Sequence, residues 1–189
     1  MLRDLVLKNR SYRRFYEAEP VAEETLRQLV DLARYVASGA NRQPLKYRLV
    51  WTPGERARVF ATLSWAGALP DWPGPAEGER PSAYIIVLGD TTISKSFGVD
   101  HGIAAQTILL GATELGLGGC MIASVERDDL RRQLEIPPHL EVLLVLALGW
   151  PKEKVVLEEL PPGGDHRYWR DADGVHHVPK RRLEDIIVS

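Results

Sequence analysis

The fold is decided by the stretch DHGIAAQTILLGATEL, residues 100–115. Apolar residues occupy almost every side of a helix built from this sequence, which is typical of a helix buried at the centre of a domain. Asp100 is expected to cap the start of this helix and Gly116 to end it. A buried helix needs other layers around it, so the flanking sequence should supply a sheet and further helices.

The segments on either side supply those layers. Residues 83–89 and 141–149 are short, nearly continuous apolar runs bounded by turn residues, which predicts buried strands. Further strands are expected at 46–51 and 118–124, helices at 3–8, 22–37, 53–68 and 126–134, and a loop rich in proline and glycine at 69–81. A last segment, 185–188, has strand character. One sheet enclosed by helices is the simplest architecture for this order.

The bulk composition limits the classes of protein that need to be considered. A chain of 189 residues fits one domain, or one domain with an extended tail. A formal net charge of −2 gives no general reason to bind nucleic acid or an anionic membrane. Cys120 is the single cysteine, which excludes an intramolecular disulfide. With no signal-peptide layout and no apolar run long enough to cross a bilayer, a cytoplasmic soluble protein is expected.

Two basic clusters lie near opposite ends of the chain. The first is R-S-Y-R-R-F, residues 10–15, where Ser11 and Arg13 would point the same way in an extended segment. A guanidinium beside a hydroxyl suits a phosphate, although a solvated basic turn also explains these six residues. The second is V-P-K-R-R-L, residues 178–183, where Lys180 and Arg182 would share a face; an ordinary basic tail is the alternative.

Two further motifs lie between these clusters. S-G-A-N-R-Q-P, residues 38–44, places the amides of Asn41 and Gln43 after small residues, which suits either a polar ligand or simple backbone capping. G-L-G-G-C-M-I-A-S, residues 116–124, allows a flat ligand to approach the backbone, or tight packing of a helix on a strand. His176 and His177 would face opposite sides of a strand, and no Cys or carboxylate stands at a familiar spacing for a metal.

In their order and spacing these motifs resemble the FMN-dependent nitroreductase family. The matching elements are R-S-x-R-x-F, then S-x-x-N-x-Q-P, a late apolar helix ending in G-L-G, and a terminal P-K-x-R. The resemblance covers nearly the whole chain, and its second and fourth elements are the most specific. It implies one α+β domain over residues 1–189, with a central mixed, largely antiparallel sheet flanked by helices.

The resemblance also implies cofactor-binding roles. Members of the family bind FMN without a covalent link, its phosphate through the first and last motifs and its ring and ribityl chain through the others. The residues implied here are Arg10, Ser11, Tyr12, Arg13, Asn41, Gln43, Ile122, Ala123, Ser124, Lys180 and Arg182. Since FMN carries the chemistry, no catalytic side chain and no metal ion is implied. Asn9 departs from the pattern, because many members carry an arginine there.

The implied activity is electron transfer from NADH or NADPH to an organic acceptor, such as a nitroaromatic or a quinone, by a ping-pong mechanism. The implied assembly is a homodimer with FMN at the interface, in which the tail from about residue 165 to 189 reaches over the partner subunit. Neither nucleic acid nor a membrane is an expected partner.

Three alternatives stay open. The first is a flavin-dependent dehalogenase or flavin-modifying relative, and the second is an FMN-binding sensor or carrier without turnover. The third is a small RNA binder built on residues 8–14 and 180–182, against which the net charge of −2 argues.

Overall fold

A computed structural model describes residues 1–188 of the chain as two separate sheets with helices packed on the larger one. The larger sheet contains β1 (Leu45–Val50), β2 (Ala83–Asp90), β4 (Leu140–Gly149) and β3 (Gly118–Ile122), in that order across the sheet. Every neighbouring pair in it is antiparallel. The predicted α+β class is confirmed.

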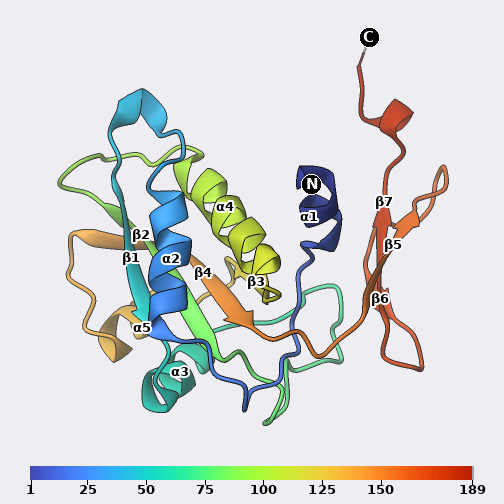
Figure 1. Ribbon diagram of the computed structural model, residues 1–189, viewed down its shortest axis with the longest axis horizontal. Helices are drawn as coiled ribbons and strands as arrows, with labels where there is room; N and C mark the ends of the chain where they lie inside the picture. The colour runs from blue at the N-terminus through green and yellow to red at the C-terminus, as the bar shows by residue number, and fades with distance from the viewer. Residues whose placement is uncertain (189) are drawn as a thin grey trace.

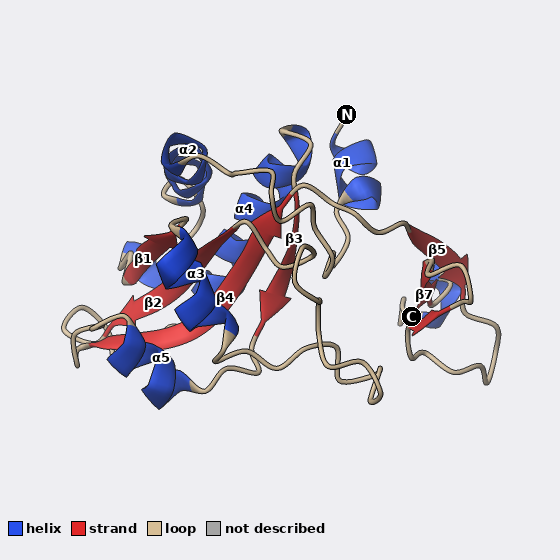
Figure 2. Cartoon of the chain, turned by 90° about the horizontal axis from the view of Figure 1, so that it is seen from below, coloured by secondary structure: helices blue, strands red, loops and turns tan. Residues whose placement is uncertain are grey.

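Helices cover both faces of this sheet, and the alternation of side chains along β2 shows how. Ile85 and Val87 join one buried cluster with α2 (Glu23–Ala33) and α4 (Asp100–Glu114). Tyr84 and Ile86 join a second cluster with α3 (Pro53–Phe60) and α5 (Arg127–Gln133). In Figure 2, α2 lies above the strands and α5 lies below them. Because both faces are covered, β2 is buried along its whole length, as its apolar sequence predicts.

The central helix α4 ends as predicted but begins differently. Gly116 has φ +80°, its N–H bonds to the Thr113 carbonyl, and the Leu117 N–H bonds to the Ala112 carbonyl. These two bonds satisfy the last carbonyls of the helix. Asp100 does not cap the helix, because Val99 occupies the cap position and Asp100 is the first helical residue. Its carboxylate instead binds the loop that follows α2.

Two predicted helices are too long, and tertiary contacts explain both errors. The helix expected to reach residue 68 ends at Phe60. Beyond it, Leu63 forms a bridge with Val125, and the Ser64 N–H bonds to the Ser124 carbonyl 3.0 Å away, which draws the chain toward the end of β3. The helix expected over 22–37 ends at Ala33, after which the chain unwinds so that Gly39 reaches Asp100.

A second sheet near the C-terminus is absent from the sequence-based expectation. It contains β5 (Val155–Glu159), β6 (Trp169–Arg170) and β7 (His176–Lys180). β5 and β7 are parallel, whereas β6 and β7 are antiparallel. The strand expected at 185–188 is wrong, since a 3₁₀ turn over Leu183–Asp185 is stabilised by the Arg182–Asp185 ion pair at 3.0 Å.

The second sheet lies at the end of the molecule opposite β1, with α1 (Leu2–Lys8) between it and α4 (Figure 1). In this view α1 and β7, which come from opposite ends of the chain, are neighbouring elements. Between residues 1 and 188, no helix combines the length and the apolar character needed to cross a membrane.

Candidate functional site

The segment after α1 is held in an extended conformation along the edge of the larger sheet. Ser11 forms a parallel bridge with Gly119 of β3, and the Tyr12 N–H bonds to the Gly119 carbonyl at 3.0 Å. Asn9 secures the start of this segment, because its Nδ2 donates to the Leu109 carbonyl of α4 at 3.0 Å. A side chain at Gly119 would come within 2.5 Å of Leu109, so only glycine leaves room for this packing.

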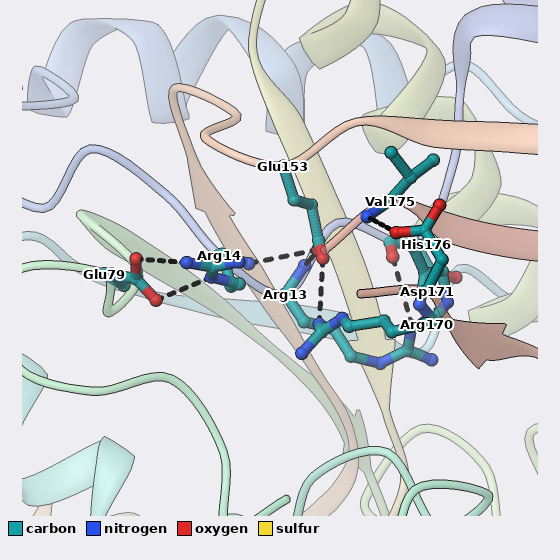
Figure 3. A network of polar contacts seen from close by, with 9 residues as sticks. Arg13, Arg14, Glu79, Glu153, Arg170, Asp171, Val175 and His176 are labelled. Carbon is teal, nitrogen blue, oxygen red and sulfur yellow. Dashed lines mark hydrogen bonds and ion pairs between the residues drawn. The ribbon is translucent and has the colours of Figure 1, made fainter. Parts of the chain in front are cut away.

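Glu153 joins this segment to the second sheet (Figure 3). Its buried carboxylate accepts hydrogen bonds from the backbone N–H groups of Arg13 and Arg14, and from Nη2 of Arg170 at 2.9 Å. The paired groups are distant in the sequence, and a single glutamate in a polar stretch carries no signal for this role. Glu153 fixes the backbone of Arg13 and leaves its side chain available for other contacts.

Four residues predicted at the two ends of the chain come together in one cavity of about 380 Å³. We call it the basic cavity. Its lining consists of Asn9, Arg10, Ser11, Arg13, Gln106, Leu109, Met121, Tyr168, His176, Val178 and Lys180. None of these lining residues is acidic. The lining combines the extended segment, α4, β3 and β7, so the cavity depends on both sheets.

The three cations of the basic cavity have no ion pair with a carboxylate anywhere in the described residues 1–188. Arg13 is only 9% exposed, and its Nη1 donates to the Ser11 carbonyl at 3.2 Å. Nη2 of Arg10 donates to the Val6 carbonyl at 2.6 Å, and burial lowers the pKa of Arg10. Partly buried cations without counter-charge are costly, so this arrangement suits an anion.

A second cavity of about 200 Å³ adjoins the first and shares Arg13, Met121 and Tyr168 with it. The end of β3 lines this second cavity through Ile122, Ala123 and Ser124, opposite the segment that follows α3. Both carbonyls at the strand end are occupied, since Arg127 Nη2 donates to Ala123 at 3.1 Å and the Ser64 N–H donates to Ser124 at 3.0 Å. The strand end is therefore held from both sides.

Asn41 and Gln43 lie elsewhere in the chain and line neither of these cavities. Both have left-handed backbones, with φ of +52° and +51°, and so does Ala40 at +51°. Such conformations in non-glycine residues are strained and persist where the surroundings impose them. Here the Asp100 carboxylate accepts from Ser38 Oγ at 2.6 Å and from the Gly39 N–H at 3.0 Å.

The remaining two predicted site residues make structural contacts within the chain. The ring of Tyr12 lies against Gly118, and burial raises the pKa of its hydroxyl. Arg182 lies outside β7 and does not line the basic cavity; it pairs with Asp185. His176 and Tyr168 do line the basic cavity, and no motif singled them out as ligands.

Comparison with known proteins gives a consistent result. The model of the Nitroreductase family matches residues 6–150. A protein of Archaeoglobus fulgidus, provisionally named NADH dehydrogenase/NAD(P)H nitroreductase, is 26% identical over 149 residues, which cover 75% of this chain and 80% of that protein. A solved structure with the same provisional name, from Parabacteroides distasonis, is 25% identical, with a TM-score of 0.67 over 81% of this chain and 88% of that one.

A third similar protein is named for its cofactor. The structure of an FMN-dependent nitroreductase from Clostridium difficile is 22% identical, with a TM-score of 0.63 over 79% of this chain and 87% of that one. At this level of identity the likeness shows a shared fold. The family match ends at residue 150, so the second sheet, which supplies His176 and Lys180 to the basic cavity, lies beyond it.

Proposed function

The chain belongs to the nitroreductase family, and from this we propose that it is an FMN-dependent oxidoreductase that transfers electrons from NADH or NADPH to an organic acceptor. The class of acceptor that we propose is a nitroaromatic, a quinone or a similar compound. The observation that carries the proposal is the basic cavity, where three cations meet and no carboxylate of residues 1–188 pairs with them.

The residues of the basic cavity fit the phosphate of FMN. Arg10 and Arg13 offer planar pairs of donors, Lys180 adds a compact positive charge, and the Ser11 hydroxyl adds a short donor. A phosphate with close to two negative charges would supply the counter-charge that the described part of the chain does not give these three cations. This is the strongest fit between the chain and the cofactor.

The adjoining cavity fits the remainder of the same ligand. It shares a wall with the basic cavity, so one elongated molecule can extend from Lys180 to Ser124. Ile122, Ala123 and Ser124 would support the flavin ring through their backbone, which Arg127 and Ser64 hold in place. A preorganised backbone is suited to stabilising charge that develops during a reaction.

When bound, FMN would supply the redox chemistry, taking two electrons from NADH or NADPH and passing them to the acceptor. The chain binds and orients the cofactor, and we assign no side chain as a general acid or base. If the nicotinamide donor and the organic acceptor bind in turn at the same place beside FMN, the enzyme should follow ping-pong kinetics.

The strained loop that carries Asn41 and Gln43 is proposed to contact FMN bound to a partner subunit. Within one chain this loop shares no lining residue with the basic cavity. An interface between two copies would bring the loop of one copy to the cavity of the other. The proposal therefore includes a homodimer, with Tyr12 and Arg182 completing the cofactor site.

Absorption spectroscopy tests the proposed function directly. Purified protein should be yellow, and NADH or NADPH added without oxygen should bleach the flavin absorption. Subsequent addition of a nitroaromatic or a quinone should restore the colour. Colourless protein that binds no added FMN would contradict the proposal, and bound FMN that neither nucleotide bleaches would favour the sensor or carrier. Analysis of the products would identify dehalogenation or modification of the flavin itself.

A further inference from the structure

His176 lines the basic cavity, and its position on β7 is firmly set. It is the first residue of the strand, its N–H bonds to the Lys154 carbonyl at 2.8 Å, and only 1% of the residue is exposed. Side chains alternate along a strand, so the adjacent His177 points away from the cavity toward Glu158 and Asp171. The two histidines therefore have different surroundings, and only His176 is placed to act on the cavity.

The ring of His176 contacts Arg13 and Tyr168. Arg13 Nη1 donates a long hydrogen bond to His176 Nε2, at 3.4 Å, and the two residues lie close together in Figure 3. The Tyr168 ring lies 5.1 Å from the His176 ring between centroids, and the Arg13 guanidinium carbon lies 4.7 Å above the same Tyr168 ring. Arg13 is thus enclosed by an aromatic face and an imidazole nitrogen.

The imidazole of His176 accepts this bond in its neutral form. Burial, and after it the nearby positive charges of Arg13 and Arg170, lower the pKa of His176 to about 4. A neutral acceptor has a particular advantage in this place. A carboxylate would orient the guanidinium equally well, but it would also cancel the positive charge that an incoming anion needs.

We propose that His176 is a positioning residue for the anion site: by accepting a hydrogen bond from Arg13 without adding negative charge, it holds the guanidinium toward the basic cavity. This inference rests on the proposed function, in which the cavity receives the phosphate of FMN. His176 acts through Arg13 and is not assigned a contact with the reacting atoms.

The test compares two ligands that differ only in the phosphate. Flavin-free protein is titrated with FMN and with riboflavin, and binding is followed by quenching of flavin fluorescence. His176→Phe keeps a ring but removes the acceptor, and it should weaken FMN binding about fivefold to tenfold while riboflavin binding changes by less than about twofold. His176→Gln keeps an acceptor and should bind FMN within about twofold of the parent protein.

Two controls separate positioning from a general effect on the fold. His177→Gln alters the neighbouring histidine, which faces away from the cavity, and should leave the ratio of FMN to riboflavin affinity unchanged. In an Arg13→Ala background, His176→Phe should cause no further loss of FMN binding, because the residue through which His176 acts is gone. If His176→Phe does not fold, His176→Asn replaces it, since its shorter amide cannot reach Arg13.

The outcomes are distinguishable. Equal losses of FMN and riboflavin affinity, an unchanged FMN affinity in His176→Phe, or additive losses with Arg13→Ala would each overturn the role of His176. If the parent protein binds riboflavin as tightly as FMN, the phosphate is not held in the basic cavity, and both the proposed site and this inference fail. If the parent discriminates and Arg13→Ala removes that discrimination, the proposed site stands and the His176 variants decide the inference.

Discussion

At the scale of single residues, the charges of the basic cavity should determine how tightly FMN binds. Arg13 is buried between Ser11 and Tyr168, whereas Lys180 is exposed at the end of β7. A hydrogen bond to a charged group contributes about 1.5–3 kcal/mol, so Arg13→Ala or Lys180→Ala should weaken FMN binding roughly tenfold or more. Flavin content after purification and fluorescence titration measure the effect.

Lys95→Ala is a suitable control for these two substitutions. Lys95 is an exposed cation in the loop before α4, and it does not line the basic cavity. The variant should retain as much flavin as the parent protein. If Arg13→Ala and Lys180→Ala also retain their full flavin content, the phosphate assignment is wrong.

The pKa values of the adjacent residues His176 and His177 should be shifted in opposite directions. Asp171, and then Glu158, raise the pKa of His177 above its ordinary value, whereas burial lowers that of His176 to about 4. The contacts of His177 with Asp171 and Glu158 therefore contribute their full stability below pH about 6.5, and this stability is lost as the pH rises through the raised pKa of His177. His176 has the opposite effect on stability. Its neutral form is favoured in the folded chain, so the protein loses stability as the pH falls from about 6.5 to about 4.

NMR of the two imidazole rings across pH 3 to 9 would measure both values. The ring of Trp169 is stacked on that of His177, with 4.0 Å between the ring centroids, so its signal provides a second probe of the protonation of His177. A His177→Gln spectrum assigns the resonances. Two midpoints that both lie near 6.5 would contradict the opposed surroundings of the rings.

The sequence predicts some of these residues and misses others for a physical reason. Arg10, Ser11, Arg13 and Lys180 carry their chemistry in their side chains, so a motif can indicate it. Glu153 acquires its role from partners that are 140, 139 and 17 positions away, and the local sequence does not indicate them. The role of His176 is equally invisible in the sequence, because it depends on Arg13, which the fold places beside it.

At the scale of elements, long buried segments are predictable and the ends of surface elements are not. The bounds of β2 and α4 are predicted within about one residue because both elements bury long apolar stretches. The expectation that α4 is buried on every side is wrong, since Ile103 and Gln106 lie on an exposed face of the helix. The end of α3 depends on pairing with the end of β3, which helix propensity does not encode. β6 has only two residues and depends on β7 for its hydrogen bonds, so its sequence alone gives no signal.

The loop between α2 and β1 depends on a single carboxylate from α4. Asp100→Ala would remove the acceptor for Ser38 Oγ and the Gly39 N–H, and so release three left-handed residues from their support. We expect a loss of about 2–3 kcal/mol in the free energy of unfolding, from hydrogen bonds to a charged group. Cleavage by trypsin after Arg42 should become faster.

Asp128→Ala is the matched control for this loop. Asp128 also lies in the first turn of a helix, α5, and its side chain is exposed without comparable partners in the described chain. Urea unfolding and the rate of trypsin cleavage would be compared for the two variants. Equal rates of cleavage after Arg42 would show that Asp100 does not hold the loop.

At the scale of the whole molecule, the candidate site requires both sheets to be formed. The extended segment and β3 come from the part matched by the family, whereas Lys180 comes from the second sheet. Exposed apolar residues follow directly after that sheet: Leu183, Ile186 and Ile187 are 62%, 60% and 64% exposed. Three such side chains in five residues would be costly to leave in water, and a partner subunit could cover them.

Replacing Leu183, Ile186 and Ile187 with serine should therefore weaken a homodimer. Burying one such side chain contributes about 1.5–3 kcal/mol, so even partial burial of three predicts a dimer dissociation constant at least about tenfold higher. Sedimentation over a range of concentrations measures this constant, and circular dichroism should show that the subunit stays folded. FMN affinity should fall in parallel, because the proposed cofactor site needs the loop of Asn41 from the partner subunit. An unchanged dissociation constant would show that the tail does not contribute to the interface, and a monomeric protein that binds FMN fully would show that one chain makes the whole site.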